Sequence, residues 1–492
     1  MTRFTERPRV RLAMFLGMNP MTITGAVLTT SAAVTLLAFW IFLIAQGGAI
    51  HPYYAILFFF ILPGIFILGL ILMPLGAILR RRKLKSEGGI PAEIPRVDLR
   101  SPMLRRALVL VVLLSFVNFA IMGTASYKAV EYMDSAQFCG QTCHTPMLPE
   151  FTAYTNSPHS RVACVECHIG PGAPWFVKSK ISGLRQLYAV AFKTYSRPIP
   201  SPVHDLRPAR DTCEHCHWPQ RFTGDKLMVH TKYSDDEANT PATNVLVLKI
   251  GGHSFEGRVG IHGRHLDTTE RIEYAHSDER RQVIPLVTYT DDDGKKVEYV
   301  STETKATPAE LAAMPRRKMD CMDCHNRPTH AFQMPERAVD DAISSGRISA
   351  TLPYIKKQAV AALKTDYPDR ETASQKIPQS IADYYKASYP AVYQGQRASV
   401  ETASEQIKAI YLRNVFPEMK VTWGTHPNNL GHEDFLGCFR CHDGKHKSAD
   451  GRVINDDCAA CHQVLAMEER DPKILTDLGV KAKPGSVEFP GR

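Results

Sequence analysis

Six short motifs of two cysteines and a histidine constrain this chain of 492 residues more than any other feature of its sequence. All 12 cysteines fall into close pairs, and a histidine directly follows the second cysteine of every pair. Histidine makes up only 19 of the 492 residues, so chance does not account for the coincidence. The pairs are Cys139 with Cys143, Cys164 with Cys167, Cys213 with Cys216, Cys321 with Cys324, Cys438 with Cys441 and Cys458 with Cys461, and the histidines are His144, His168, His217, His325, His442 and His462.

The pattern C-x-x-C-H is typical of covalent c-type haem attachment, because both thiols add to the porphyrin and the adjacent imidazole ligates the iron. Zinc is the main alternative, but a tetrahedral zinc site normally draws on two spaced pairs of ligands rather than on one histidine beside each cysteine pair. Disulfides also fit an even number of cysteines but leave the histidines unexplained. We therefore predict six haem c groups. The first motif, CGQTCH, has three residues between its cysteines, so its attachment is the irregular one.

The first 130 residues differ in composition from the rest. Residues 21–46 contain no Asp, Glu, Lys or Arg and are long enough to cross a bilayer, as is a second apolar run from about residue 53 to residue 79. A third run, residues 107–124, is shorter but still spans. The first run is too long for a signal peptide and lacks a cleavage site, so we interpret it as a retained helix. The sequence therefore predicts three transmembrane helices.

The positive-inside rule orients these helices. Four arginines precede the first helix, and RRRKLK with four further arginines lies between the second and the third, so both segments are expected in the cytoplasm. The chain after about residue 127 then lies on the far side, where haem c is attached and disulfides survive. We predict a multi-pass protein of the bacterial inner membrane whose haem domain is periplasmic. The net charge of +9 collects at the cytoplasmic membrane face, so we expect no nucleic-acid partner.

The predicted fold is multidomain: three transmembrane α-helices, then a loop-rich, mainly α multihaem c-type cytochrome domain with a small β-rich insert. NVLVLKI, QVIPLVTYT and KKVEYVS predict short strands, and the segment after residue 333 has helical periodicity. The expected divisions are a basic cytoplasmic tail (1–20), the membrane region (21–126), three haem motifs (127–217), the β-rich insert (218–320), the fourth motif (321–332), a helical segment (333–415), a two-haem module (416–470) and a tail (471–492).

Most haems in such assemblies have two strong axial ligands, so the irons require donors beyond the motif histidines. Histidines beside a motif are better placed for this than others, and one a few residues from its own motif reaches a neighbouring haem more easily than the opposite face of its own. GIHGRH, in the insert, offers two more candidates, of which we expect one to ligate. The candidate distal ligands are His159, His330, His432, His446, His262 and His265.

At CGQTCHTPM, SPHSRVACVECHIGPGAPW and CMDCHNRPTH the sequence resembles the NapC/NirT family of membrane-anchored multihaem quinol dehydrogenases. The resemblance covers roughly residues 105–332. It implies that the first haem lies near the membrane with a methionine ligand and an open face toward quinol, which makes Met147 the candidate ligand. It also implies that His159 and His330 are distal ligands and that a lysine after the second motif serves the quinol site. Lys180, with Lys178 nearby, is the closest match.

The sequence departs from the family in several places. The first motif is widened, and Met147 lies three residues after His144 rather than the usual two, so the ligand of the first iron is either His144 or Met147. No acidic residue matches the family's quinol-site carboxylate. Lys178 and Lys180 are also suited to contact lipid headgroups at the membrane interface, and Met147 to packing. The first two membrane helices, the β-rich insert and the last two haems have no counterpart in the family's four-haem core.

Together these features favour an electron-transfer protein that takes electrons from menaquinol or another quinol and passes them along six haems to a periplasmic or outer-membrane acceptor. That acceptor is expected to be a periplasmic redox protein or a membrane redox complex. Two other functions fit the same motifs. One is a terminal reductase of nitrite, hydroxylamine or a similar substrate, although the many spare histidines argue against an open catalytic haem. The other is a subunit that only connects two membrane redox complexes, for which the extra helix pair would be the docking element.

Overall fold

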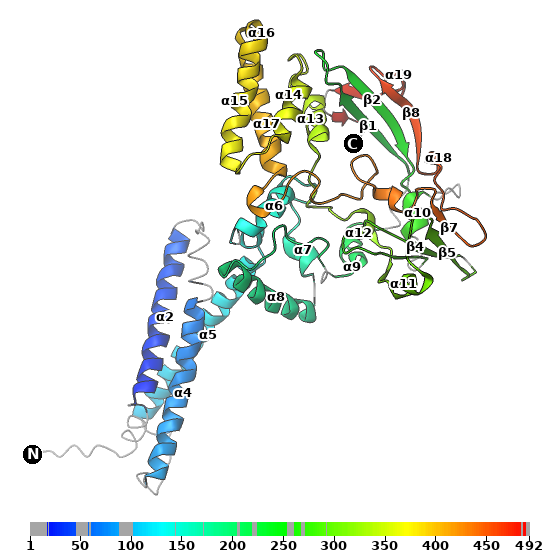
Figure 1. Cartoon of the computed structure of the whole chain (residues 1–492). Coiled ribbons are helices and arrows are strands. Elements are labelled where there is room, and N and C mark those ends of the chain that lie inside the picture. The colour runs from blue at the N-terminus through cyan, green and yellow to red at the C-terminus, as the bar shows by residue number, and fades with distance from the viewer. Residues whose placement is uncertain are drawn as a thin grey trace, which may run out of the picture. The chain divides into compact units, whose positions relative to one another are not determined.

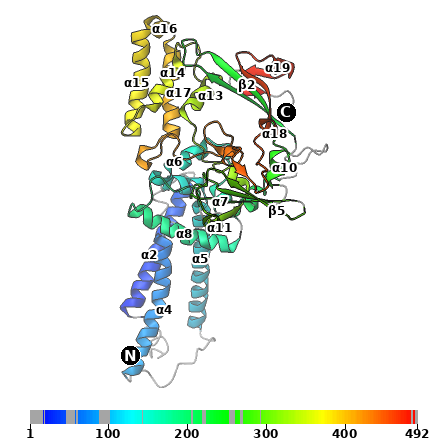
Figure 2. The ribbon, with the colours of Figure 1, turned by 45° about the vertical axis from the view of Figure 1, so that its right-hand side comes forward.

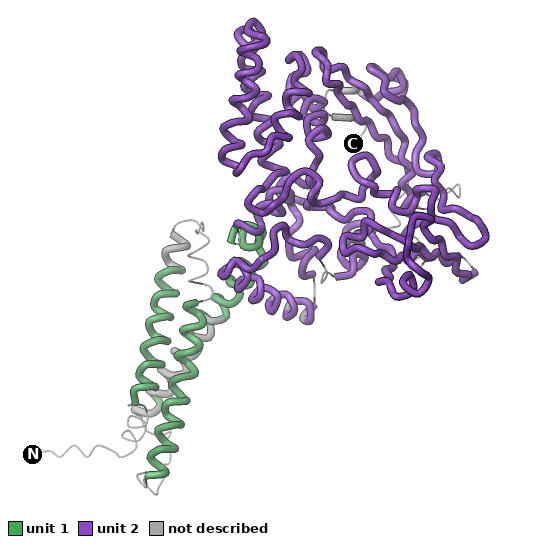
Figure 3. The backbone as a smooth tube through the Cα atoms, viewed as in Figure 1, with its two compact units in different colours: residues 1–142 green, residues 143–492 purple. Residues whose placement is uncertain are grey.

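The computed structural model describes residues 17, 19–45, 58, 61–87, 102–142, 144–170, 172–203, 207–218, 224–252, 260–266, 271–291, 293–483 and 486–488. The chain divides into two compact units, residues 1–142 and 143–492 (Figure 3). Cys143, in the first cysteine motif, lies outside the described residues, as do residues 53–57, 59 and 60 of the second predicted membrane span. Each unit is described by itself below.

Long helices make up the first unit: α2 (Pro20–Ala45), α4 (Leu62–Ser86) and α5 (Pro102–Met133) (Figure 1). Two of them contain stretches long and apolar enough to cross a membrane, Pro20–Phe39 and Leu62–Ser86. The third predicted span, 107–124, is the middle of the 32-residue helix α5, and as a membrane span it stays a prediction. A π-helical turn, η2 (Phe138–Thr142), follows α5.

Small residues bring α2 and α4 together. A Cβ atom added to Gly25 would lie 2.7 Å from the carbonyl oxygen of Gly69, so neither glycine leaves room for a side chain. The Thr22 hydroxyl donates across the same contact to the carbonyl of Met73 at 3.1 Å. Close approach through glycine and threonine is how apolar helices associate in a bilayer, where no hydrophobic effect drives them together.

The second unit begins with four helices. These are α6 (His144–Thr155), α7 (Cys164–His168), α8 (Ala173–Ala191) and α9 (Ala209–Cys213). Of these, α7 and α9 carry cysteines of the second and third motifs, and α6 begins at the histidine of the first. Irregular chain separates them, as predicted for a loop-rich body. Gly172 begins α8 at φ 114°, a conformation that residues with a side chain rarely adopt, and the proline at the next position but one favours a helix start.

Two small antiparallel sheets follow. The first has the order β1-β2-β8, from β1 (Lys226–Tyr233), β2 (Pro241–Leu248) and β8 (His462–Glu469). The second has the order β6-β3-β4-β5-β7, from β3 (Ile272–Ala275), β4 (Leu286–Thr290), β5 (Lys296–Ser301), β6 (Arg316–Lys318) and β7 (His446–Lys447). The strands predicted in the insert are β2, β4 and β5. Each sheet also takes a strand from beyond residue 440, so the insert and the C-terminal motifs fold together.

Between β3 and the helical segment lie α11 (Pro308–Ala313) and α12 (Cys321–Cys324), and the short helix α10 (Ile261–Leu266) precedes β3. Near the C-terminus are η4 (Pro417–Met419), η5 (Gly437–Arg440), α18 (Cys458–Cys461), α19 (Lys473–Asp477) and the hairpin β9 (Lys481–Lys483) and β10 (Ser486–Glu488). These pieces are too short to be stable alone, because one turn of helix fixes more backbone than its hydrogen bonds reward.

The largest apolar core belongs to five helices, α13 (Pro335–Ser344), α14 (Ile355–Lys364), α15 (Arg370–Ser388), α16 (Pro390–Gly395) and α17 (Arg397–Asn414). They pack around fully buried residues such as Leu363, Ile377 and Ile407. In both views these helices lie beside the three-stranded sheet (Figures 1 and 2). The backbone N–H of Tyr233 in β1 donates to the Asp340 carboxylate of α13 at 3.0 Å, which joins the two parts.

Candidate functional site

Five of the six cysteine motifs, those of the second unit that start at Cys164, Cys213, Cys321, Cys438 and Cys458, each begin on or at the end of a short helical turn. In the third, fourth, fifth and sixth motifs the backbone N–H of the motif histidine donates to the carbonyl of the first cysteine, at 2.8 Å for His217 and His325 and 3.0 Å for His442. Residues three and four apart on a helical turn lie on one face. One turn therefore presents two thiols and an imidazole to the same side, which is what haem attachment needs.

The third motif, with Cys216 as its predicted second attachment cysteine, begins at the end of its helix rather than at the start. Helix α9 ends at Cys213, so Cys216 lies beyond the helix, in a turn closed by its own backbone N–H, which donates to the Cys213 carbonyl at 3.1 Å. The Cys216 side chain is exposed, as are those of Cys167 and Cys458, whereas Cys213 is half-buried. The structure therefore places Cys216 at the surface and off the helix. Its attachment to haem stays a prediction.

The first motif is arranged differently. Cys139 lies in the π-helical turn η2, and its Sγ is 3.9 Å from the Met133 carbonyl oxygen. A π-helical turn takes up more residues than an α-helical one, which accounts physically for the extra residue in CGQTCH. His144 begins α6, and its side chain lies outside the described part of the chain. Met147 is half-buried on α6, one turn further on.

The other motif histidines each face a second histidine from elsewhere in the chain. The ring centres are 5.9 to 6.4 Å apart in all five cases. The pairs are His168 with His330, His217 with His159, His325 with His262, His442 with His265, and His462 with His432. The sequence predicted the distal candidates individually, and the structure places each opposite one particular motif.

This spacing is too wide for two rings in contact and fits two rings that share one metal. With metal–nitrogen bonds of about 2 Å on each side, plus the radius of each ring, the centres of two axial imidazoles lie about 6 Å apart. Among the described residues, no group of three or more Cys, His, Asp or Glu side chains is arranged to hold a metal ion, as a structural zinc site would require. The side chains present therefore fit haem with two histidine ligands.

Hydrogen bonds at the other ring nitrogen orient several of these histidines. The Nδ1 atom of His330 is 2.9 Å from the carbonyl oxygen of Glu150, and that of His265 is 2.8 Å from the carbonyl oxygen of Ile261. The Nδ1 atom of His442 is 2.6 Å from the Asn455 carbonyl oxygen. A hydrogen bond from Nδ1–H fixes the tautomer and leaves Nε2 as the basic nitrogen for a metal.

Burial favours the neutral form of five of these rings. It lowers the pKa of His168, which His330 lowers further, and it lowers the pKa of His330, His262, His265 and His325. A neutral imidazole has a lone pair to donate, whereas a protonated one has none. For these five histidines burial therefore favours the ligand form.

His446 does not join any of these pairs. It lies in β7, only 2% exposed, with Nδ1 2.9 Å from the Asp443 carboxylate and Nε2 2.8 Å from the Ile284 carbonyl oxygen. Both ring nitrogens thus have protein partners, so neither is left for iron. The expectation that this histidine reaches the next haem does not match its place, because the DGKH loop turns it into the five-stranded sheet instead.

The third, fourth, fifth and sixth motifs are joined in the order of the sequence. Helix α9, which carries Cys213 of the third motif, lies beside helix α12, which carries Cys321 of the fourth. His262 and His265, on the single helix α10, face the fourth and the fifth motif respectively. Phe439, inside the fifth motif, stacks on His432, whose ring faces the sixth, with ring centres 4.3 Å apart.

Arg440, inside the fifth motif, makes the most direct of these connections. Its guanidinium donates at 2.6 Å to the carbonyl oxygen of Asp323, which lies inside the fourth motif, and at 2.8 Å to that of Arg281. The Asp323 carboxylate is buried and accepts from the Tyr274 hydroxyl at 2.6 Å and from Arg317 Nε at 2.8 Å. Buried charges need such partners, so this network fixes the two attachment turns to each other.

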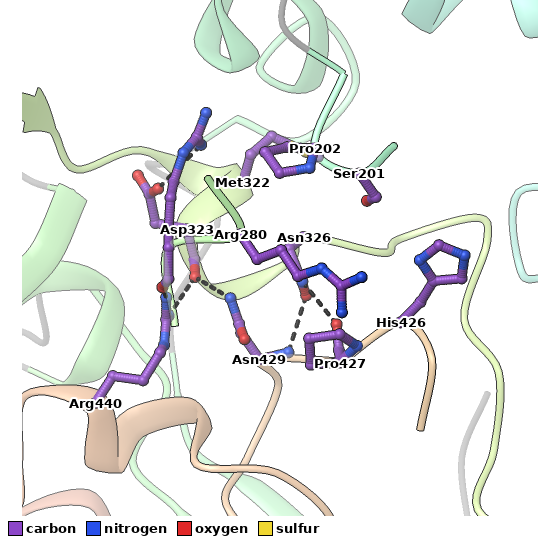
Figure 4. Close-up of a pocket in the computed structure, with 11 residues that line it drawn as sticks. Ser201, Pro202, Arg280, Met322, Asp323, Asn326, His426, Pro427, Asn429 and Arg440 are labelled. Carbon is purple, nitrogen blue, oxygen red and sulfur yellow. Dashed lines mark hydrogen bonds and ion pairs between the residues drawn. The ribbon is translucent and has the colours of Figure 1, made fainter. Parts of the chain in front are cut away.

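A small polar pocket opens beside this network (Figure 4). Its walls come from the fourth motif, from Arg280 and Arg281, and from the segment that carries His426. Asn326 ties that segment to the fourth motif, since its amide donates to the Pro427 carbonyl at 2.9 Å and its side-chain oxygen accepts from the Asn429 N–H at 2.9 Å. The pocket therefore belongs to the framework that holds the fourth and fifth motifs.

The two predicted quinol-site lysines lie on α8. Lys180 is half-buried, and Lys178 is exposed with its Nζ 5.1 Å from the centre of the Trp175 ring. Among the described residues of α8 there is no histidine of the five pairs.

Sequence reasoning missed the residues that support the ligands. Glu150 is the main one, because its backbone carbonyl orients His330 and its carboxylate pairs with Arg327 at 3.0 Å. Asp323 and Arg440 also escaped notice, although a charged residue between the cysteines of a motif is a signal that could have drawn attention to them. Which carbonyl or carboxylate each would meet depends on tertiary contacts.

Comparison with known proteins adds two findings. Residues 101–199 match the model of the NapC/NirT cytochrome c family, N-terminal region. Over 454 residues the chain is 44% identical to the cytochrome c-type protein ImcH of Geobacter sulfurreducens. The aligned region covers 92% of this chain and 88% of that protein. No solved structure matches the chain.

Proposed function

Because the chain belongs to the NapC/NirT cytochrome c family, and is therefore a membrane-associated multihaem c-type cytochrome of electron transfer, we propose that it oxidises menaquinol and delivers the electrons to a periplasmic acceptor. The acceptor is a periplasmic redox protein or a membrane redox complex. The single observation that supports this best is the set of five histidine pairs, one at each motif from the second to the sixth.

We propose that the chain holds six haem c groups, one at each motif. Bound haem supplies reversible one-electron oxidation and reduction, and the protein sets the potential through ligands, hydrogen bonds and burial. The paired histidines are the proposed axial ligands of the second to the sixth group. His446 is left out of this set, because both of its ring nitrogens are hydrogen-bonded within the protein. For the first group the proposed ligand is His144 or Met147.

The chain's own contribution to electron transfer is to hold successive groups close and rigid. The contact between helices α9 and α12 and the contact of Arg440 with Asp323 fix neighbouring attachment turns. Both contacts lie between motifs that follow each other in the sequence. We therefore propose that electrons enter at the first motif and leave from the sixth.

Quinol oxidation also releases protons, so a basic group near the entry point is needed. Lys180 is our proposed candidate, with Lys178 as its neighbour. We further propose that α5 is a third membrane span and that the second unit is periplasmic, which places the entry motif near the outer surface of the inner membrane. The distribution of arginine and lysine around the apolar helices supports that orientation.

The test uses the full-length holoprotein in lipid nanodiscs, mixed under anaerobic conditions with a water-soluble menaquinol analogue. We expect rapid reduction of the haem absorption bands, and we expect Lys180→Gln to slow it at least tenfold. Lys357→Gln, an exposed lysine on α14, is the matched control and should reduce at the wild-type rate. Dithionite should reduce all three proteins alike, which shows that electron transfer beyond the entry point is intact.

The other outcomes separate the competing functions. If dithionite reduces the haems but the menaquinol analogue does not, quinol oxidation is contradicted. The remaining function is then that of a subunit that connects two redox complexes. Catalytic consumption of nitrite or hydroxylamine by the reduced protein would instead indicate a terminal reductase.

A further inference from the structure

Arg207, six residues before Cys213, has a buried side chain whose charge the protein matches poorly. The side chain is 13% exposed, and its Nε atom is buried without a hydrogen-bond partner among the described residues. The Nη2 atom lies 3.9 Å from the Asp211 carboxylate, which is beyond hydrogen-bond distance, and that carboxylate is itself 56% exposed. Because removing a guanidinium from water is costly, a buried one needs close acceptors. Arg207 therefore needs an acceptor beyond the protein groups that surround it.

The Arg207 side chain lies against the second motif. A Cβ atom added to Gly170, two residues after His168, would be 2.7 Å from Arg207 Cδ and closer still to Nη1. Gly170 adopts φ 66°, and its backbone N–H donates to the Val165 carbonyl at 2.7 Å, which closes the turn of the second motif. Helix α9, which ends at Cys213 of the third motif, lies beside α7. The guanidinium is thus held where the second and third attachment turns meet.

The acceptor that suits this position is a carboxylate. A guanidinium offers a planar fork of N–H donors, which matches the two oxygens of a carboxylate. Every haem has carboxylate side chains on its porphyrin, and a carboxylate that enters a protein also needs donors. A haem held at either of the two motifs brings such a group into the second unit. Pairing it with Arg207 satisfies both charges.

We propose that Arg207 binds a carboxylate of the haem held at the second or the third motif, and that it raises the reduction potential of that haem. The inference rests on the proposed haems and adds a residue that sets a potential without ligating iron. A positive charge beside the haem favours the ferrous state, because the reduced haem carries one more negative charge than the oxidised one.

The first test is spectroelectrochemical titration of the full-length holoprotein. We expect Arg207→Gln to shift one haem about tenfold toward the oxidised form at a fixed potential, which lowers its midpoint by about 59 mV. Arg207→Lys keeps the charge and should stay closer to the wild type. Arg161→Gln is the matched control, because it removes an exposed arginine three residues before Cys164. Solvent and salt screen that charge, so its effect should be much smaller.

Two further variants identify the haem. His330→Met and His159→Met each replace one proposed distal ligand, of the second and of the third haem respectively. The charge-transfer band of histidine–methionine ligation then reports the midpoint of that haem alone. Adding Arg207→Gln should lower the midpoint in at least one of the two backgrounds. No change in either background would overturn the proposal.

The second test is infrared difference spectroscopy, which detects the contact itself. Cells that depend on supplied aminolaevulinic acid, labelled with carbon-13 at its carboxyl group, place the label in the haem carboxylates and not in those of Asp and Glu. We expect a labelled carboxylate band to change frequency in Arg207→Gln and not in Arg161→Gln. A lower midpoint with every labelled band unchanged would show that Arg207 acts through water or a protein group, which would also overturn the proposal.

Peptide mass spectrometry shows whether the second and third motifs hold haem in each protein. Their absence from the wild-type protein would refute the proposed cofactors, and this inference with them. Haem at both motifs, with midpoints and labelled bands unchanged in Arg207→Gln, would overturn this inference alone. If Arg207→Gln does not assemble, Arg207→Lys provides the test, because a single ammonium group does not reproduce the paired N–H donors and the labelled band should still move.

Discussion

The role of a histidine in this protein follows from where its two ring nitrogens lie. In His330 and His265 the Nδ1 atom is hydrogen-bonded to a backbone carbonyl oxygen, which leaves the other ring nitrogen for a metal. Each ring faces a partner histidine at a spacing that fits a metal between the two. In His446 both nitrogens meet protein oxygens. The sequence offers only proximity to a cysteine motif, and this is nearly equal for the two: His330 lies five residues after His325 and His446 four residues after His442. Only tertiary structure separates the ligand candidate from the framework residue.

Replacing one distal histidine tests a single pair. We expect His262→Ala to convert one low-spin haem to high spin, because the iron at the fourth motif loses an axial nitrogen, while the intact mass falls only by the side-chain difference. Electron paramagnetic resonance of the oxidised protein gives the spin states. His276→Ala is the matched control, since the His276 Nδ1 atom is 2.9 Å from the Asp278 carbonyl oxygen and the ring faces no motif histidine. Equal high-spin signals in the two variants would refute the assignment.

Glu150 is expected to set the potential at the second motif. Its carboxylate oxygen lies 3.3 Å from the His330 Nδ1 atom, and negative charge there makes the imidazole a stronger donor and stabilises ferric iron. Glu150→Gln should therefore raise the reduction potential of one haem. It also leaves the buried Arg327 without its ion pair, at a cost of about 3–5 kcal/mol in stability. Spectroelectrochemical titration measures the first effect and thermal unfolding the second.

The control for this variant is Glu166→Gln, an exposed carboxylate inside the second motif itself. If loss of charge near the haem were sufficient, both variants would shift the titration equally. Our account requires the shift to be larger for Glu150→Gln.

His426 gives the protein a specific sensitivity to acid. Burial, helped by the nearby Arg327, lowers the pKa of His426 to about 4 from an ordinary value of 6.5. Between these two values the unfolded chain binds a proton that the folded one does not, so stability falls as the pH falls through this window. The full loss is about 3 kcal/mol. Hydrogen exchange of residues 422–430, corrected for intrinsic rates, should show faster local opening at pH 5 than at pH 7.

His426→Phe should remove most of that pH dependence, because the ring no longer titrates and can still stack on Phe332. His215→Gln changes an exposed histidine and should leave the dependence as it is in the wild type. A pH dependence that survives in His426→Phe would assign it to another group.

The strands that could be predicted have a hydrophobic pattern of their own, whereas the strands that were missed depend on pairing with a distant segment. Strands β2, β4 and β5 alternate or run apolar over several residues, so the sequence indicates them. Strand β7 has two residues and β8 begins at the histidine of the sixth motif, so neither has a pattern of its own. Both exist because β5 and β2 offer them a free edge to pair with. Pairing between distant segments is a property of the fold, and local sequence does not encode it.

The contact between α2 and α4 makes opposite predictions for two glycines. Gly25→Ala should destabilise the helix pair by about 1–3 kcal/mol, because the new methyl group would overlap the Gly69 carbonyl oxygen. Gly64→Ala should stabilise it by up to about 1 kcal/mol, since nothing lies within 4 Å of the added atom and alanine favours helix. Thermal aggregation in detergent ranks the variants. A lower midpoint for Gly64→Ala than for Gly25→Ala would contradict this packing.

At the scale of the whole molecule, the cysteine motifs, the membrane attachment and the mainly helical, loop-rich body with small sheets could be predicted from sequence, and so could the family. The motifs are local and chemically specific, and apolar helices reveal themselves by length. The pairing of distal histidines with motifs could not be predicted, because His159 and His330 each cross to a motif other than their own. The strand pairing between the insert and the C-terminal motifs could not be predicted either, and nor could the surface position of Cys216. Both depend on tertiary structure.

The central claim is that five of six haem groups in this chain are held between two histidines. Near-infrared magnetic circular dichroism of the fully oxidised holoprotein tests it most directly, because its charge-transfer band distinguishes bis-histidine from histidine–methionine and from high-spin ligation. Normalised to chain concentration, the bis-histidine band should correspond to five groups if the group at the first motif has a different ligation. It should correspond to six if that group also has two histidine ligands. An intensity equal to four groups or fewer in intact, fully loaded protein would contradict the pairs described above.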